Sequence, residues 1–151
     1  MSAIVSRIEI ARPPEDAFAY VVDPTRFPEW QNDVVTVRVE QSGRLGLGSR
    51  FTTVRRIGRT EREMTQEVTA LDPPRGWSVR GVGGPIRPNA DVTVEPLDDG
   101  TRSLVTFAFD FDGQAMGKVL LPLVRRMTAK QAPMSIRRLK ERLETGAAQT
   151  S

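Results

Sequence analysis

The stretch TRSLVTFAFDF at residues 101–111 is followed almost at once by QAMGKVLLPLVRRMTAKQAPMSIRRLKERLE at residues 114–144. In the first stretch apolar side chains recur at every second position, which is typical of a strand with one buried face. In the second stretch they recur at every third or fourth position, which is typical of a helix. The chain therefore changes from strand to helix between these stretches, and we expect one long C-terminal helix.

Two prolines lie inside the helical stretch. Pro122 and Pro133 each lack a backbone N–H and clash with the preceding turn, so each is expected to bend the helix. They are about three turns apart in the sequence, and both bends should therefore point to the same side. We predict one helix curved around a convex surface, and the sequence leaves open whether it is continuous through both prolines.

Upstream of this helix, consecutive segments alternate apolar and polar residues with a period of two. They are DVVTVRVEQ, SRFTTVRRIG, TEREMTQEVTAL, GWSVRGV, NADVTVEPL and the opening stretch TRSLVTFAFDF. Between them, Gly58-Arg59 fits a two-residue type II′ turn with glycine first, and Asp98-Asp99-Gly100 is a strong signal for a tight hairpin. Connections this short make neighbouring strands antiparallel.

The N-terminal part supplies a further strand and two short helices. AIVSRIEIA at residues 3–11 alternates like a half-buried strand. RPPEDAFAYVVD predicts a helix that starts at Pro14, whose missing N–H costs nothing in the first turn, and PTRFPEW predicts a second helical turn. The resulting order predicts an α+β fold with a curled, seven-stranded antiparallel sheet whose apolar face is covered by the long helix. A rod cannot fill a curled sheet everywhere, so we expect a cavity between them, where small ligands bind.

Composition narrows the classes of function. The chain has 151 residues, no cysteine, no histidine and a net charge of +3. It therefore lacks the commonest general base near neutral pH and the commonest metal ligands, and we expect no metal and no cofactor. No apolar run approaches the ~18 residues of a membrane span, and no signal peptide is recognised, so a cytoplasmic location is expected. Residues 1–146 are predicted to form one domain, followed by a flexible tail at residues 147–151.

Five segments carry a family resemblance: PPEDAFAYVVDPTRFPEW, GLGSRF, ALDPPRGWSV, LDDGTRSLVTFAF and the terminal RRLKERLE. Together they resemble the SRPBCC superfamily over residues 3–145, and within it the polyketide cyclase/dehydrase-like branch. That superfamily also includes START-like domains and the birch-pollen-allergen proteins. The resemblance implies a helix-grip fold with a deep apolar cavity between the sheet and the C-terminal helix. It does not select one activity, because its members bind lipids, hormones, quinones, polyketides or aromatic compounds, and some catalyse cyclisation or dehydration.

In that superfamily the segment matching TRFPEW, residues 25–30, lies near one end of the cavity. The resemblance therefore implies that Phe27 and Trp30 close the sheet edge and border the pocket. The alternative interpretation is that Trp30 packs in the core without any ligand contact.

The inward faces of the predicted strands and of the long helix provide a set of ligand-binding candidates. As a group they predict an apolar ligand, and the methionines among them tolerate ligands of irregular shape. Ordinary core packing is the alternative for any single residue. The candidates are Trp30, Phe51, Thr53, Arg55, Met64, Gln66, Trp77, Phe107, Phe109, Met116, Leu120 and Met127.

Arg55 and Gln66 are polar residues on these inward faces. A buried guanidinium is costly unless it is hydrogen-bonded, and one reason to keep it is to hold a ligand carbonyl or carboxylate through charge-assisted bonds. The alternatives are that Arg55 reaches solvent or pairs with Glu63. A two-residue turn after this strand sets Arg55 opposite Arg62, whereas a slip sets it opposite Met64, and the sequence does not decide between them.

Catalytic residues are harder to assign. Tyr20 is the only tyrosine and the best lone phenol for proton transfer, although helix spacing also explains it as a packing residue. Arg55 is the other candidate, and loop carboxylates such as Glu29 and Asp33 are more typical of solvated positions. No matching set of cyclase pocket residues can be placed here, which counts against an enzyme. The enzymatic alternative that the sequence leaves open is a metal-free cyclase or dehydratase.

Three functional hypotheses follow. The first is a protein that encloses a small hydrophobic ligand, which is aromatic, polyketide-like or lipid-like. The second is a polyketide cyclase or dehydratase that uses the same cavity, and the third is a lipid or quinone carrier that docks by its basic helix. The other explanation for the basic residues of this helix is that they form a solvated outer face. The aromatic residues that nucleic-acid binding is expected to place between basic ones are missing. A homodimer is expected only by analogy. The basic residues are Arg125, Arg126, Lys130, Arg137, Arg138, Lys140 and Arg142.

Overall fold

The computed structural model describes residues 4–40, 46–113 and 117–145. Its elements follow the predicted order of one strand, two short helices, six strands and one long helix. In chain order they are β1 (Ile4–Ile10), α1 (Pro14–Val21), the 3₁₀ turn η1 (Pro24–Arg26), α2 (Phe27–Trp30), β2 (Val34–Val39), β3 (Arg50–Ile57), β4 (Thr60–Asp72), β5 (Gly76–Gly83), β6 (Ile86–Leu97), the 3₁₀ turn η2 (Asp98–Gly100), β7 (Arg102–Gly113) and α3 (Gly117–Glu144).

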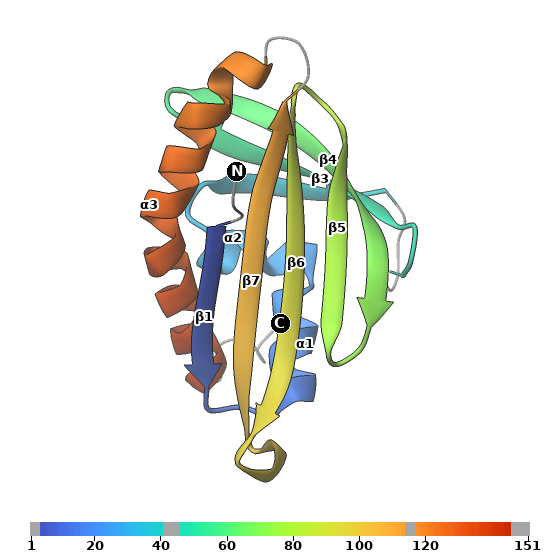
Figure 1. The fold of residues 1–151 in the computed structure, drawn as a ribbon, viewed down its shortest axis with the longest axis vertical. Coiled ribbons are helices and arrows are strands. Elements are labelled where there is room, and N and C mark those ends of the chain that lie inside the picture. Colours follow the sequence, from blue (N-terminus) through green and yellow to red (C-terminus); the bar gives the residue numbers. More distant parts are fainter. Residues whose placement is uncertain (1–3, 41–45, 114–116, 146–151) are drawn as a thin grey trace.

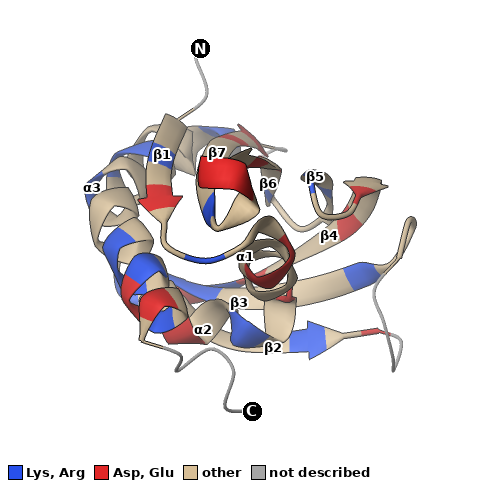
Figure 2. Ribbon diagram, turned by 90° about the horizontal axis from the view of Figure 1, so that it is seen from below, with Lys and Arg blue, Asp and Glu red and all other residues tan. Residues whose placement is uncertain are grey.

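The strands form one seven-stranded antiparallel sheet in the order β1-β7-β6-β5-β4-β3-β2. Figure 1 shows β6 and β7 running along the long axis of the molecule, with α3 beside β1. Seen from below in Figure 2, the strands trace most of a ring, and α3 lies between β1 and α2. The sheet therefore curls around a long C-terminal helix, which confirms the predicted helix-grip fold.

The β3–β4 hairpin turns on two residues, Gly58 and Arg59. Gly58 has a φ of 64°, a left-handed conformation that glycine adopts without steric cost and that a two-residue turn with glycine first requires. The register that the sequence left open is thereby decided, because Arg55 of β3 lies opposite Arg62 of β4. These like charges are unfavourable neighbours, and Arg55 finds its ion pair elsewhere.

The β6–β7 connection is wider than the tight hairpin that the sequence predicted. Leu97 pairs with Arg102, so residues 98–101 form the loop between them. Asp98 and Asp99 have φ values of 49° and 59°. Aspartate tolerates this left-handed conformation because its short polar side chain bonds locally. The pairing of β6 with β7 therefore ends at Leu97 and Arg102, which leaves a longer loop than the tight hairpin predicted from Asp98-Asp99-Gly100.

The short helices α1 and α2 lie behind the strands in Figure 1, with α1 below α2. Pro14 begins α1, and Glu15 and Asp16 lie in its first turn, where carboxylates interact favourably with the helix dipole. Asp23 then caps the following 3₁₀ turn by accepting a hydrogen bond from the Thr25 N–H at 3.0 Å. Local signals of this kind explain why the chain makes two helical turns before it enters β2.

α3 is continuous from Gly117 to Glu144 and contains both prolines. Pro122 and Pro133 are exposed to solvent. Water can therefore satisfy the carbonyl groups that lose their helical partner at each proline, and the helix continues through both positions. Figure 1 shows its N-terminal turns leaning toward the end of β7.

Buried apolar side chains form two separate clusters. The main cluster surrounds α1, α2 and the C-terminal turns of α3, and the smaller one lies under the N-terminal half of α3. The main cluster includes Tyr20, Phe27, Trp30, Phe51, Trp77, Phe107, Ile136, Leu139 and Leu143. The smaller cluster consists of Ile57, Met64, Ile86, Phe111 and Val124.

Candidate ligand-binding cavity

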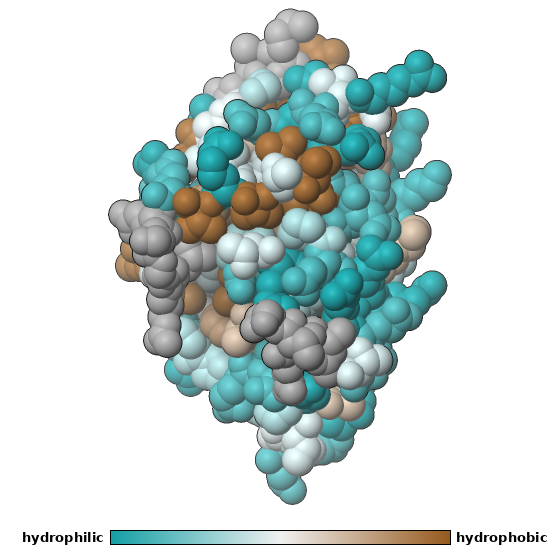
Figure 3. All heavy atoms as spheres, turned by 180° about the vertical axis from the view of Figure 1, so that it is seen from behind, coloured by the Kyte–Doolittle hydropathy of each residue, from teal (hydrophilic) through white to brown (hydrophobic). Residues whose placement is uncertain are grey.

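A hollow lies between α3 and the concave side of the sheet, where the two clusters meet. Its cavity volume is about 70 Å³, and a second hollow of about 20 Å³ adjoins it on the side of the main cluster. One water needs about 10–15 Å³ on the same scale, so the larger hollow has room for several waters or a small organic guest. It opens to the surface. Figure 3 shows apolar side chains gathered in a patch on the rear face, ringed by hydrophilic ones.

One stripe of α3 forms the helix wall of the larger hollow, and four strands, the last residue of α2 and the connector after it form the rest. The helix residues recur at three and four positions, as one face of a helix must. They are Val124, Met127, Thr128, Gln131, Ala132, Ser135 and Ile136. The sheet and connector residues are Trp30, Gln31, Asp33, Arg55, Arg56, Ile57, Met64, Gln66, Pro88, Ala90, Phe109 and Phe111.

The structure brings most of the sequence-predicted ligand-binding residues to this cavity. Those that line the larger hollow are Trp30, Arg55, Met64, Gln66, Phe109 and Met127. Trp77 and Phe107 line the smaller hollow, which shares Trp30, Arg55, Gln66 and Phe109 with the larger one. Their contact with a ligand stays a prediction.

Three of the predicted residues line neither hollow. Phe51 is fully buried and stacks on Trp77 with ring centroids 6.3 Å apart. Thr53 is also fully buried, and its hydroxyl donates a hydrogen bond to Gln66 Oε1 at 3.4 Å. Leu120 packs against the smaller cluster. Alternation along β3 correctly predicted that Phe51 and Thr53 lie on the inward face, but neighbouring rings and strands fill the space in front of them. Met116 lies outside the described residues.

Trp30 combines the two roles that the sequence set against each other. Its side chain is 2% exposed and belongs to the main cluster, where its ring lies 5.6 Å from that of Phe107 and edge-on to Phe27. The same ring borders both hollows. Trp30 is therefore a core residue that also forms a cavity wall, and Phe27 borders only the smaller hollow.

Arg55 is held at the cavity wall by Asp33. Its Nη1 lies 3.0 Å from Asp33 Oδ2, and the two side chains are 14% and 23% exposed. Asp33 is positioned because its carbonyl accepts a hydrogen bond from the Arg56 N–H at 2.8 Å, next to a register shift between Val34 and Thr36. The expected alternative partner, Glu63, pairs with Arg38 instead (3.4 Å).

Three buried polar atoms of the residues that line the cavity have no hydrogen-bond partner within the part of the chain that the structure describes. They are Trp30 Nε1 and Arg55 Nε, both donors, and Gln131 Oε1, an acceptor. An unmade hydrogen bond in a buried position costs about 1–3 kcal/mol. The lining is thus apolar over most of its surface, with two donors and an acceptor whose bonding capacity is unused.

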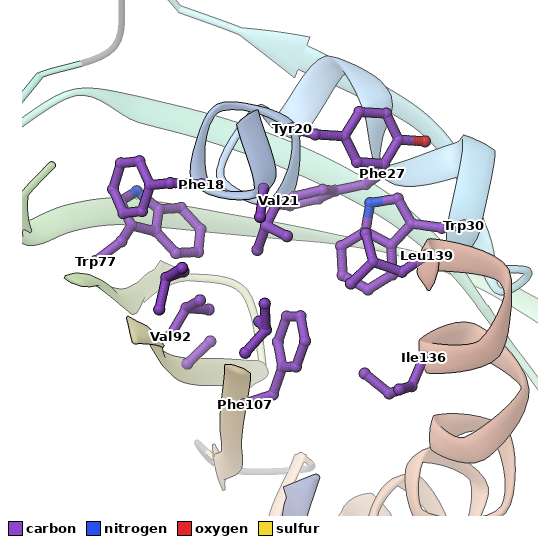
Figure 4. Packing of buried hydrophobic residues seen from close by; sticks show 14 of the residues in the cluster. Phe18, Tyr20, Val21, Phe27, Trp30, Trp77, Val92, Phe107, Ile136 and Leu139 are labelled. Atoms are coloured by element: carbon purple, nitrogen blue, oxygen red, sulfur yellow. The ribbon is translucent and has the colours of Figure 1, made fainter. Parts of the chain in front are cut away.

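Tyr20, the other weak catalytic candidate, lies away from the cavity. Its hydroxyl donates a hydrogen bond to Glu29 Oε1 at 2.9 Å, and Arg26 lies over its ring. Burial, together with the hydrogen bond and negative charge of Glu29, raises the pKa of Tyr20 well above its ordinary value. Figure 4 shows the hydroxyl pointing away from Phe107 and Ile136. The position of Tyr20 thus agrees with its interpretation as a packing residue. It does not agree with proton transfer from Tyr20 to a ligand in the hollow.

Sequence reasoning missed the helix polar residues and undervalued Asp33. Gln131 lies four positions after Met127, so the helical period places it on the same inward face. That signal was available in the sequence. The position of Asp33 beside Arg55 could not be predicted from the sequence, because it depends on the irregular pairing between β2 and β3.

The described residues lack two further features. Within those ranges, no helix is long and apolar enough to cross a membrane. Residues 4–40, 46–113 and 117–145 contain no group of three acidic, histidine or cysteine side chains arranged to hold a metal ion.

A curled antiparallel sheet that grips a C-terminal helix over a cavity defines a protein with the helix-grip fold. The chain belongs to the family described as polyketide cyclase / dehydrase and lipid transport, whose model matches residues 1–144. Membership supports binding of a hydrophobic ligand or a cyclase role in general terms, and it specifies neither the ligand nor a reaction. No curated protein sequence matches the chain.

Solved structures share the fold at low sequence identity. The Zhui aromatase/cyclase from Streptomyces sp. R1128 aligns with a TM-score of 0.76 and 13% identity, covering 94% of this chain and 93% of that one. A START superfamily protein from Mycobacterium smegmatis gives 0.71 and 16%, with full coverage of both chains. The protein TTHA0849 from Thermus thermophilus gives 0.71 and 19%, covering 99% of each. These likenesses establish the fold alone.

Proposed function

We propose that this protein binds a compact, mainly apolar ligand in the hollow under α3, and that Arg55 holds a carbonyl or carboxylate of that ligand. One observation carries the proposal. Nη1 of Arg55 is occupied by Asp33, whereas its buried Nε has no hydrogen-bond partner among the described residues. The Nε/Nη2 edge of a guanidinium donates two parallel bonds to a carboxylate.

The rest of the lining supports the same class of ligand. Met64, Phe109 and Met127 provide apolar walls, and methionine adapts to irregular shapes. The volume of about 70 Å³ favours one or two fused rings over a long acyl chain. A ligand of this kind buries its rings against the methionines and leaves its polar group at the Arg55 end.

Isothermal titration calorimetry with two matched probes tests this proposal. The probes are 2-naphthoate and 2-naphthylmethylammonium, which have the same ring and opposite charge. We expect 2-naphthoate to bind at least about tenfold more tightly, because a hydrogen bond to a charged group contributes about 1.5–3 kcal/mol. Equal affinity for both probes would show that Arg55 does not select the ligand.

A double variant removes the pair without leaving one charge buried alone. In Asp33→Asn/Arg55→Met the preference for 2-naphthoate should disappear. The matched control is Arg38→Met/Glu63→Gln, which removes another arginine–carboxylate pair whose side chains are 67% and 63% exposed on the sheet, and which should bind like the wild type. Native mass spectrometry of gently purified protein then tests whether a small hydrophobic molecule co-purifies.

A second candidate function is a metal-free cyclisation or dehydration in the same hollow. The observation that favours it is the Asp33 carboxylate, which lines the hollow beside Arg55. Asp33 would accept a proton from a carbon between two ligand carbonyls, and Arg55 would stabilise the enolate oxygen that forms.

Turnover of a linear poly-ketone, followed by liquid chromatography and mass spectrometry, tests the second candidate. Asp33→Asn should lower the rate by about 10²-fold or more, which is the range for loss of a general base. Tyr20→Phe should remain active, because Tyr20 does not line the hollow. Full activity in folded Asp33→Asn would remove this candidate and leave ligand binding unaffected.

A further inference from the structure

The outward face of α3 mixes exposed apolar and cationic side chains. Val119, Leu123 and Met134 are 75%, 42% and 55% exposed, and Arg126 and Lys130 are exposed between them. At about 100° per residue these positions fall within one stripe along the helix. We call these five residues the outer stripe of α3.

The charge along this part of the helix has one sign. Residues 117–140 contain no aspartate or glutamate. Among the residues that the structure describes, Lys118, Arg126, Lys130 and Arg137 have no ion-pair or hydrogen-bond partner. Figure 2 shows acidic residues on α3 at its near, C-terminal turns. The outer stripe is therefore a cationic surface that the described part of the protein leaves uncompensated.

The mixture of residue types favours a lipid surface over a protein partner. Cores of protein interfaces are enriched in aromatic side chains and depleted of lysine, whereas the outer stripe has lysine and no aromatic residue. Helices that lie in a membrane interface place aliphatic side chains below a row of lysine and arginine. Val119 and Leu123 lie one turn apart on the outer stripe, and the longer side chains of Arg126 and Lys130 beside them can reach past them to the headgroups.

We propose that the outer stripe of α3 docks the protein on a membrane surface rich in anionic lipid. The cations would meet the headgroups, and Val119 and Leu123 would insert among the acyl chains. The adjoining face of the same turns lines the hollow through Val124 and Met127, so docking brings the cavity close to the bilayer. This inference concerns a different surface and does not depend on which ligand the cavity holds.

Liposome flotation of the full chain tests the proposal. Vesicles of phosphatidylcholine alone are compared with vesicles that also contain phosphatidylglycerol. We expect flotation only with the anionic vesicles, and weaker flotation as added salt screens the charges. Absence of binding to anionic vesicles at low salt would overturn the proposal.

Two double charge reversals separate docking by the stripe from attraction by net charge. Arg126→Glu/Lys130→Glu should weaken binding by about tenfold or more. Arg7→Glu/Arg59→Glu changes the net charge equally at two exposed positions away from α3, one in β1 and one in the β3–β4 turn, and should bind like the wild type. Equal losses in both variants would show that net charge alone is responsible and would overturn the assignment to α3.

A second pair of variants tests insertion. Val119→Ser/Leu123→Ser should still bind at low salt but should lose binding at moderate salt, where the apolar contribution is needed. Val5→Ser/Val35→Ser, at exposed apolar positions of the sheet, should remain unchanged. Wild-type behaviour of the first pair would overturn insertion. Binding to polyglutamate without binding to vesicles would replace the lipid surface by an acidic protein.

Discussion

The two ends of α3 are packed in opposite ways. At the C-terminal end, Leu139 and Leu143 are buried within the main cluster. At the N-terminal end, Val119 and Leu123 are exposed, and Val124 belongs to the smaller cluster beside the hollow. One helix is therefore part of the core at one end and a cover over a cavity at the other.

Polar contacts follow the same division. Arg12 Nη1 donates to the Leu143 carbonyl at 3.0 Å, and the Ala11 N–H donates to Glu144 Oε2 at 2.8 Å. These bonds tie the C-terminal end to the segment after β1. One end of the helix therefore helps to hold the core together, whereas fewer buried contacts hold the other end, beside the hollow.

The largest expected effect is on stability at the C-terminal end. Leu139→Ala removes a fully buried side chain and should lower the free energy of unfolding by about 2–5 kcal/mol. Leu123→Ala, at the exposed end, should change it by about 0.5 kcal/mol or less. Urea denaturation measures both variants. Similar losses would mean that the two ends contribute equally to the core.

Hydrogen exchange sharpens the comparison without mutation. Amides in residues 118–128 should exchange on the order of tenfold faster than amides in residues 134–144, because fewer buried contacts must break to open them. Mass spectrometry of peptic peptides measures the two segments in one experiment. Uniform protection along α3 would show that it opens only as a single unit.

Filling the hollow should separate binding from stability. Ala132 lines the cavity, and Ala132→Leu places a larger side chain where the proposed ligand lies. We expect about tenfold weaker binding of 2-naphthoate, with the free energy of unfolding within about 1 kcal/mol of the wild type, because the hollow provides room. Ala129→Leu, at an exposed position of the same helix, is the matched control and should bind normally.

The sequence predicted the fold because its signals are local. Period-two alternation located the strands, and Gly58 fixed the β3–β4 turn through a conformation that other residues rarely adopt. The recurrence of apolar residues at three and four positions located α3. Each of these inferences depends on a few neighbouring residues, and none requires knowledge of what lies across the sheet.

The site was only partly predictable because it depends on contacts between distant segments. Alternation placed Phe51 and Thr53 on the inward face together with Gln66, but only Gln66 borders the hollow. The partner of Arg55 depends on an irregular pairing between β2 and β3 that brings Asp33 beside it. Periodicity gives the face on which a side chain lies, and packing decides whether that face is filled.

The smallest predicted effect concerns the polar tie at the C-terminal end. Burial alone would raise the pKa of Glu144, but hydrogen bonds from Lys140 and the Ala11 N–H outweigh it, and the pKa is lowered from 4.5. A carboxylate with a lowered folded-state pKa adds stability above its unfolded-state pKa and loses it as the pH falls through the folded-state value. Glu144→Gln should therefore cost a few tenths of a kcal/mol at neutral pH, and this difference from wild type should shrink as the pH falls below 4.5. Urea titrations across this pH range measure it, with Glu141→Gln as a control on the same helix. A pH-independent difference would mean that the tie acts through side-chain shape and not through charge.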